Sequence, residues 1–118
     1  MTQLIAFLAT GKGSWASVLE LTRQEDFESI ILITNTFGKD KFTPSENTTM
    51  LVADLRMDVE GLRDYLTDRL KPLVKGTEVA LNIVSGEGKE HMALIAALLN
   101  LGVGISLVVA GEKGMLEL

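Results

Sequence analysis

The chain has 118 residues, the length of a single domain, and nearly half of them are apolar, so we expect one domain over residues 1–118 with its own core. Its formal net charge of −5 at pH 7 excludes a general basic surface for duplex DNA or an anionic membrane, so any nucleotide site must be local. The absence of cysteine excludes disulfides and thiolate metal ligands, and a single histidine without ligand spacing leads us to expect neither a metal site nor a bound cofactor.

The first half of the chain alternates apolar runs with polar segments. The run QLIAFLAT (3–10) predicts a strand buried on both faces. It is too short to span a bilayer and no basic residue precedes it, so we expect a cytoplasmic protein without a membrane partner. Ser14 is a suitable N-cap for a following helix, and residues 29–35 and 48–55 predict two further strands. The polar segment at 36–47, broken by glycine and proline, predicts a loop.

The second half repeats the alternation more regularly. Apolar residues fall on one stripe of a helix predicted over 57–74, and a second helix is predicted over 89–101. Strands are predicted at 78–84 and 104–110, and the final MLEL predicts a short antiparallel edge strand. This order predicts an α/β fold: a Rossmann-like three-layer sandwich with a mainly parallel five-stranded sheet and an antiparallel C-terminal edge strand.

The helix predicted over 89–101 is apolar on two sides. Met92 and Leu99 belong to one apolar face, and Leu94 and Leu98 belong to another. A helix that is apolar nearly all round is buried on two sides, and in so small a chain we expect one side to meet a second subunit. The sequence therefore predicts a homodimer.

Three loops that leave the carboxyl ends of predicted strands each carry a lysine next to a glycine. They are TGKGSW, NTFGKDKF and VSGEGKEH. Ligands of open α/β sheets bind beyond the carboxyl ends of the strands, so this coincidence is the main functional signal in the sequence. For the middle loop we favour the simpler interpretation of a solvated turn.

The third loop is suited to an anion. Gly86 and Gly88 allow positive φ and close approach to a ligand, and the N–H groups at the start of the next helix form an anion-binding concavity. Ser85 adds a hydroxyl and Lys89 a charge. Glu90 follows the lysine where a Walker A loop requires serine or threonine, which argues against ATP hydrolysis of that type. A plain strand-to-helix turn with a solvated lysine is the alternative interpretation.

The first loop is a weaker signal. Gly11 and Gly13 resemble the start of a dinucleotide fingerprint, but the acidic residue expected at the end of the second strand is absent, which argues against NAD. Lys12 and Ser14 are candidates for phosphate contacts. Trp15 is a candidate for stacking on a base, with a place in the core as the alternative.

The run NIVSGEGKEHMALIAALLNLG (82–102) resembles the second signature of CRISPR-associated Rossmann-fold (CARF) domains. That signature has an asparagine ending a strand, then a small-residue turn with a lysine and a methionine that opens an alanine-rich helix. The residues that match in type are Asn82, Ser85, Gly86, Lys89 and Met92. The loop TGKGSW lies where the first ligand loop of the family lies, and we expect a stand-alone, single-domain member.

The resemblance implies a homodimer of CRISPR defence that binds cyclic oligoadenylate on its two-fold axis. Some stand-alone members also cleave the ring without metal, by attack of a ribose 2′-OH on its own phosphodiester, so ring nuclease activity is an open alternative to binding alone. The implied catalytic residues are Lys89, Lys12 and Ser14. The implied ligand-binding residues are Gly11, Gly13, Trp15, Asn82, Ser85, Gly86, Gly88 and His91.

Two other functions fit the sequence. The protein could be a non-enzymatic regulatory or interaction subunit whose glycine loops are only turns, or a small nucleotide-binding enzyme of Rossmann type. Composition alone does not separate these three functions.

Overall fold

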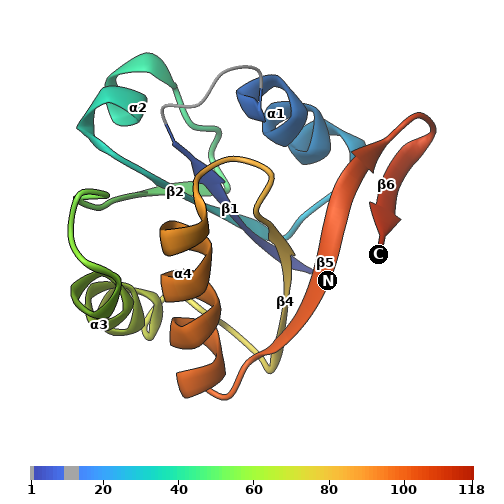
Figure 1. Ribbon diagram of the computed structural model, residues 1–118. Coiled ribbons are helices and arrows are strands. Elements are labelled where there is room, and N and C mark those ends of the chain that lie inside the picture. The colour runs from blue at the N-terminus through green and yellow to red at the C-terminus, as the bar shows by residue number, and fades with distance from the viewer. Residues whose placement is uncertain (1, 10–13) are drawn as a thin grey trace.

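The structure is a computed structural model that describes residues 2–9 and 14–118. Within that part, six strands form one sheet in the order β3-β2-β1-β4-β5-β6 (Figure 1). Neighbouring strands from β3 to β5 are parallel, and β6 runs antiparallel to β5. The predicted α/β class, the mainly parallel sheet and the antiparallel edge strand are confirmed.

The elements alternate along the chain as in doubly wound folds. In chain order they are β1 (Gln3–Leu8), α1 (Ser14–Gln24), β2 (Ser29–Thr34), α2 (Thr36–Lys41), β3 (Thr48–Val52), α3 (Val59–Leu70), β4 (Glu78–Asn82), α4 (Gly88–Asn100), β5 (Gly104–Gly111) and β6 (Gly114–Glu117). None of the described helices has the length and apolar character needed to cross a membrane.

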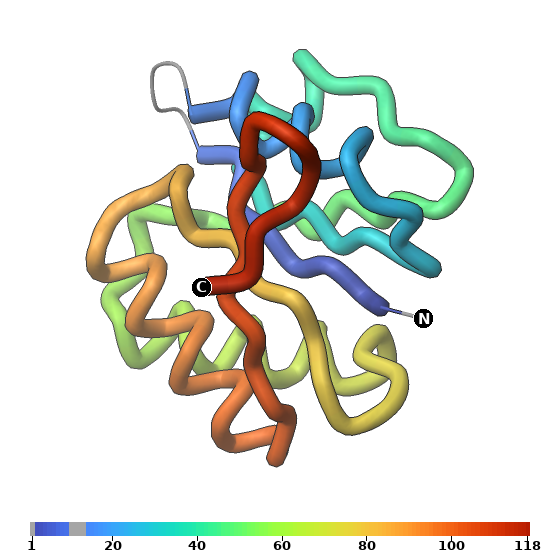
Figure 2. Tube along the Cα trace, turned by 90° about the vertical axis from the view of Figure 1, so that its right-hand side faces the viewer, coloured from blue at the N-terminus to red at the C-terminus, as the bar shows by residue number. Residues whose placement is uncertain are grey.

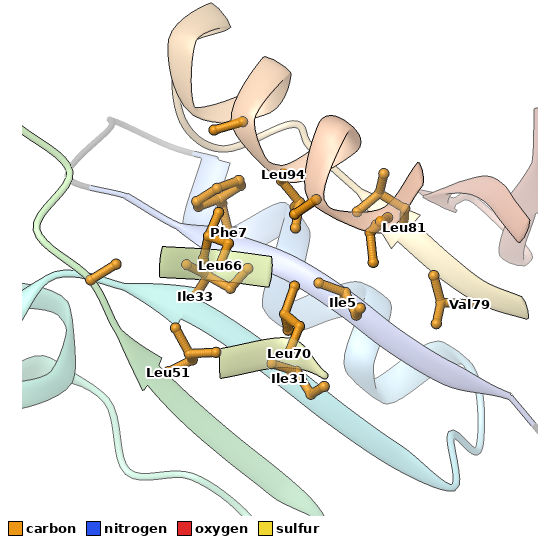
Figure 3. Packing of buried hydrophobic residues seen from close by; sticks show 14 of the residues in the cluster. Ile5, Phe7, Ile31, Ile33, Leu51, Leu66, Leu70, Val79, Leu81 and Leu94 are labelled. Atoms are coloured by element: carbon orange, nitrogen blue, oxygen red, sulfur yellow. The ribbon is translucent and has the colours of Figure 1, made fainter. Parts of the chain in front are cut away.

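Helices cover both faces of the sheet. α3 and α4 lie on one face, and α1 and α2 lie on the other (Figure 1). Alternate residues of β1 therefore enter different cores: Ile5 and Phe7 pack with Leu66 of α3 and Leu94 of α4 (Figure 3), while Leu8 packs on the α1 side. Burial on both faces explains why the strand is a continuous apolar run rather than an alternating one.

The segment between β2 and β3 is not wholly a loop, as the sequence had led us to expect for 36–47. Its first residues form the six-residue helix α2. The Asn35 side chain caps this helix by accepting a hydrogen bond from the Gly38 N–H at 2.9 Å. A Cβ on Gly38 would lie 1.8 Å from Thr34 Oγ1, so the glycine that argued against a helix is what lets α2 lie against the end of β2.

Several elements are shorter than the sequence predicted; β3, predicted over 48–55, ends at Val52. The helix predicted over 57–74 is regular only from Val59 to Leu70, and the Asp58 side chain caps its start. β4 stops at Asn82 because the Asn82 side chain replaces backbone-to-backbone hydrogen bonds at this point. Its Nδ2 donates to Val108 O at 2.8 Å, and its Oδ1 accepts from Val84 N at 3.2 Å.

The β5–β6 hairpin is fastened to α1 by one side-chain amide. Gln24 Nε2 donates to Gly111 O at 2.6 Å, and Gly111 N donates to Gln24 Oε1 at 3.1 Å. Figure 2 looks onto this hairpin and the C-terminus. The two bonds hold the antiparallel edge of the sheet against the layer formed by α1.

Candidate functional site

β1 and β4 are neighbours in the middle of the sheet, and the helices that follow them lie on opposite faces (Figure 1). α1 follows β1 on one face, and α4 follows β4 on the other. This divergence is the topological switch point at which open α/β sheets form their ligand crevice. The segments singled out in the sequence flank this point.

Ser85 joins the two strand ends. Its side chain is fully buried, and its Oγ accepts a hydrogen bond from Ala9 N at 3.0 Å. The Trp15 indole N–H donates to Ala9 O, so both polar groups of that residue are bound by predicted site residues. Trp15 also packs against the core on the α1 side, as its alternative interpretation expected.

The turn before α4 requires one glycine. Gly86 has φ of 101°, and a Cβ there would lie 2.9 Å from Glu90 Oε1 and 3.2 Å from His91 Nε2. Both side chains stabilise the turn by hydrogen bonds to its backbone. Glu90 Oε1 accepts from Glu87 N, and His91 Nε2 donates to Ser85 O, each at 2.9 Å. A carboxylate of the protein itself therefore already binds one N–H group at the start of α4.

Gly88 differs from what the sequence predicted. It is the first residue of α4, and a Cβ on it would meet no atom of the described residues within 4 Å. Positive φ, which the sequence allowed at both glycines of the loop, occurs at Gly86 and not at Gly88.

Lys89 reaches across the carboxyl edge of the sheet. Its Nζ donates to Leu55 O at 2.8 Å, which ties the first turn of α4 to the loop between β3 and α3. Lys89 is half-buried, and Leu55, whose carbonyl it binds, lines one of the two cavities of this edge.

Two cavities that share Asn35 and Arg56 open at the carboxyl ends of the strands. One of about 240 Å³ is lined by Ala9, Asn35, Leu55, Arg56, Gly86, Glu87 and Glu90. The other, of about 400 Å³, is lined by Asn35, Thr36, Phe37, Val52, Ala53, Asp54 and Arg56. Together they reach from the switch point to the ends of β2 and β3, which gives room for a ligand larger than a single phosphate.

The charges around these cavities are mixed. Asp54 Oδ1 accepts hydrogen bonds from Arg56 N at 3.0 Å and from Arg56 Nε at 3.1 Å. The backbone N–H of Arg56, followed by its guanidinium group, lowers the pKa of Asp54 below its ordinary value of 3.8, so the carboxylate is ionised at neutral pH. Asp54, Glu87 and Glu90 line the cavities together with Arg56, and Lys89 lies close enough to Asp54 to help lower its pKa. The site therefore combines cations suited to phosphate with acceptors for hydroxyl or amino donors.

The structure brings most of the predicted residues to this edge. Ser85, Gly86, Lys89 and His91 lie around the turn before α4, and Trp15 reaches the end of β1. Ser14 is the first residue of α1. Asn82 is nearly buried and its side chain bonds neighbouring backbone, a role that ends the strand. The predicted residues Gly11, Lys12 and Gly13 lie outside the described residues.

Sequence reasoning missed four residues that line the cavities: Asn35, Phe37, Asp54 and Arg56. Their signal was position rather than motif. The strands predicted over 29–35 and 48–55 included Asn35 and Asp54, but β2 ends at Thr34 and β3 at Val52, so all four residues lie just beyond a parallel strand. Phe37 is 53% exposed, which is high for an aromatic ring beside a cavity.

Compared with known proteins, the sequence matches no family model and no curated protein. Among residues 2–9 and 14–118, no group of three histidine, aspartate or glutamate side chains is placed to hold a metal ion.

Proposed function

We propose that the protein binds a small nucleotide ligand, a cyclic oligoadenylate, at the carboxyl edge of its sheet. The hydrogen bond from Ala9 N to Ser85 Oγ carries the proposal, because it joins the segment that resembles the CARF signature to the end of β1 at the switch point. The cavity of about 240 Å³ opens beside this contact.

Such a ligand offers both anionic and neutral polar groups, which suits a rim of mixed charge. Arg56 lines both cavities with an exposed guanidinium group, the geometry that suits a phosphate. Lys89 adds a second cation once its bond to Leu55 O is exchanged for the ligand. The carboxylate of Glu87 would accept from ribose hydroxyl groups or from an adenine amino group, whereas the ionised carboxylate of Asp54 would disfavour phosphate beside it.

The proposed assembly is a homodimer that uses the outer face of α4. Met92 is 70% exposed and Leu99 is 64% exposed, and residues seven apart lie on the same side of a helix. Because α4 begins at the candidate site, an isologous contact along this face would bring two copies of the site to one two-fold axis.

Ring cleavage is the second candidate function, favoured by the same cations. The 2′ oxygen would attack the adjacent phosphorus, a 2′-O–P bond would form, and the bond from phosphorus to the 5′ oxygen would break. The 2′ proton would leave to solvent and the 5′ oxygen would take one up, giving a 2′,3′-cyclic phosphate and a 5′-hydroxyl. Positioning of the ring and stabilisation of charge on phosphate by Lys89, with Lys12 and Ser14 as further candidates, would be the contribution of the protein.

A thermal-shift panel tests the proposal. Cyclic tri-, tetra- and hexa-adenylate are compared with AMP, ATP and NAD at equal concentration. A ligand present at about 100-fold excess over its Kd stabilises by roughly 2.7 kcal/mol, and we expect such a shift with at least one ring. A shift with ATP or NAD alone would favour the small nucleotide-binding enzyme, and no shift with any nucleotide would favour the interaction subunit.

A further inference from the structure

Within residues 2–9 and 14–118, β3 is an end strand of the sheet, and one side of its backbone has no neighbouring strand. Two backbone hydrogen bonds lie at the ends of its pairing with β2: Ile30 N donates to Asn47 O at 2.9 Å, and Ala53 N donates to Thr34 O at 2.8 Å. Because the bonding alternates along a parallel strand, Thr48, Met50 and Val52 direct their N–H and C=O groups away from β2. Among these outward groups, the Thr48 N–H donates to Ser45 O at 3.1 Å and the Val52 carbonyl accepts from Tyr65 OH at 2.8 Å.

A groove of about 500 Å³ runs along this open edge, between β3 and α3. One side is formed by Tyr65 and Arg69 of α3 with Pro72 and Leu73 just after it. The other side is formed by residues 49–52 of β3. A strand added beside Met50 would point alternate side chains into this groove. The site thus offers backbone pairing along one wall and apolar surface along the other.

β3 has no charge, proline or bulge along its edge. Its sequence TTMLV contains no charged residue and no proline, and its register with β2 runs without interruption from Thr48 to Val52. Natural sheets blunt exposed edges with charges, proline or bulges because a bare edge templates pairing with another chain. The unprotected edge of β3, next to a groove, is therefore suited to pairing with a segment of another chain.

The groove has one charge. Arg69 is the charged residue in its lining, and its guanidinium carbon lies 4.9 Å from the centre of the Tyr65 ring. A guanidinium group stacked in this way keeps its N–H groups for a carboxylate. Lys71 and Lys75 are exposed nearby in sequence, so this end of α3 is locally basic although the chain as a whole is acidic.

We propose that this edge binds an extended peptide segment of another protein, which adds as a strand to β3. The segment carries an apolar side chain that enters the groove beside Pro72 and Leu73 and, two residues away on the same face, a carboxylate that pairs with Arg69. This is recognition by strand addition, in which backbone bonds supply affinity and the alternate side chains supply specificity. It does not depend on nucleotide binding at the carboxyl edge.

The test is selection from a displayed library of random octapeptides, followed by fluorescence polarisation with the enriched peptides. We expect enrichment of apolar and acidic residues spaced by two. Arg69→Glu should weaken binding of the enriched acidic peptide at least tenfold. The same variant should bind a peptide in which lysine replaces the acidic residue, because the two charges are then exchanged. Arg63→Glu, the same change on α3 outside the groove, should leave binding unchanged.

A second measurement locates the contact in the unaltered protein. Amide hydrogen exchange at Met50 and Val52 should slow when the peptide binds, because their outward N–H groups become bonded. Met50→Pro, which removes one outward N–H without removing a bond to β2, should weaken binding. The proposal is overturned if no peptide is enriched, if binding leaves Met50 and Val52 exchange unchanged, or if the edge is covered in solution by β3 of a second copy.

Discussion

At Gly38 a hydrogen atom in place of a side chain lets α2 lie against the end of β2. A Cβ there would approach Thr34 Oγ1 to 1.8 Å and Leu8 O to 3.2 Å. We predict that Gly38→Ala lowers the free energy of unfolding by about 1–3 kcal/mol, because a buried methyl group without space forces backbone shifts. Urea denaturation measures the change.

Two variants check this prediction. Gly88→Ala places its methyl group in open space at the start of α4 and should leave stability unchanged or raise it by up to about 1 kcal/mol. Thr34→Ala in the Gly38→Ala background should recover part of the loss, since it removes the colliding hydroxyl. Equal losses at Gly38 and Gly88 would contradict the steric explanation.

The carboxylate of Asp54 should oppose anionic ligands. It stays ionised at neutral pH because Arg56 lowers its pKa, and it lines the larger cavity. We predict that Asp54→Asn strengthens binding of an adenylate ring severalfold, more at low salt than at high salt, as titration calorimetry would show. Asp26→Asn makes the same change at the amino ends of the strands and should have no effect; equal effects of the two variants would place the ligand elsewhere.

Lys89 and His91 should contribute differently to any cleavage. Lys89 Nζ binds the carbonyl of Leu55, a residue that lines the smaller cavity, whereas His91 Nε2 is bonded to Ser85 O within the turn. We predict that Lys89→Ala costs a charge-assisted contact of roughly 1.5–3 kcal/mol and slows cleavage more than His91→Ala does. The assay incubates cyclic tetra-adenylate with protein in excess EDTA and identifies products by mass. Activity that EDTA abolishes and Mg²⁺ restores would contradict attack by the 2′-OH without metal.

At the scale of elements, α4 has two apolar faces that differ in role. Leu94 and Leu98 are fully buried against the sheet and α3, whereas Met92 and Leu99 remain exposed. We predict that Leu99→Lys converts the proposed dimer to monomers without lowering stability, as sedimentation at about tens of micromolar would show. Leu98→Ala should instead cost about 2–5 kcal/mol of stability. A wild-type monomer at these concentrations would contradict the dimer.

The sequence predicted the strands because burial on both faces leaves an unmistakable apolar run, as at 3–8 and 29–34. It did not predict α2, since a six-residue helix containing Gly38 is held by tertiary contact rather than by propensity. It also could not tell which face of α4 is buried, because that depends on how α3 packs beside it.

The residues of the candidate site, like the elements of the fold, were predictable from the sequence only in part. The turn at 85–91 was predictable, since glycine before a helix has a local physical meaning. Asn35 and Arg56 were not. Asn35 begins the loop NTFGKDKF, for which a solvated turn was the favoured interpretation, and nothing in the segment of Arg56 marks it. The two residues meet only where parallel strands end side by side. Residues assembled by register leave no motif in the sequence.

At the scale of the whole molecule, the sheet order separates two surfaces. The switch point between β1 and β4 lies at the carboxyl edge in the middle of the sheet, and the groove beside β3 lies at its lateral edge. We predict that they act independently, so that Arg69→Glu does not change the affinity for an adenylate ring. A change in that affinity would show that the two surfaces are coupled.

Nucleotide binding at the switch point is tested most directly by amide chemical shifts during titration of the wild-type protein with cyclic tri-, tetra- and hexa-adenylate. With the ring that binds, we predict saturable changes at Ala9, Ser85 and Gly86, together with Arg56, and no change at Met50. Changes confined to other parts of the chain, or no change with any of the three rings at millimolar concentration, would contradict the proposed site.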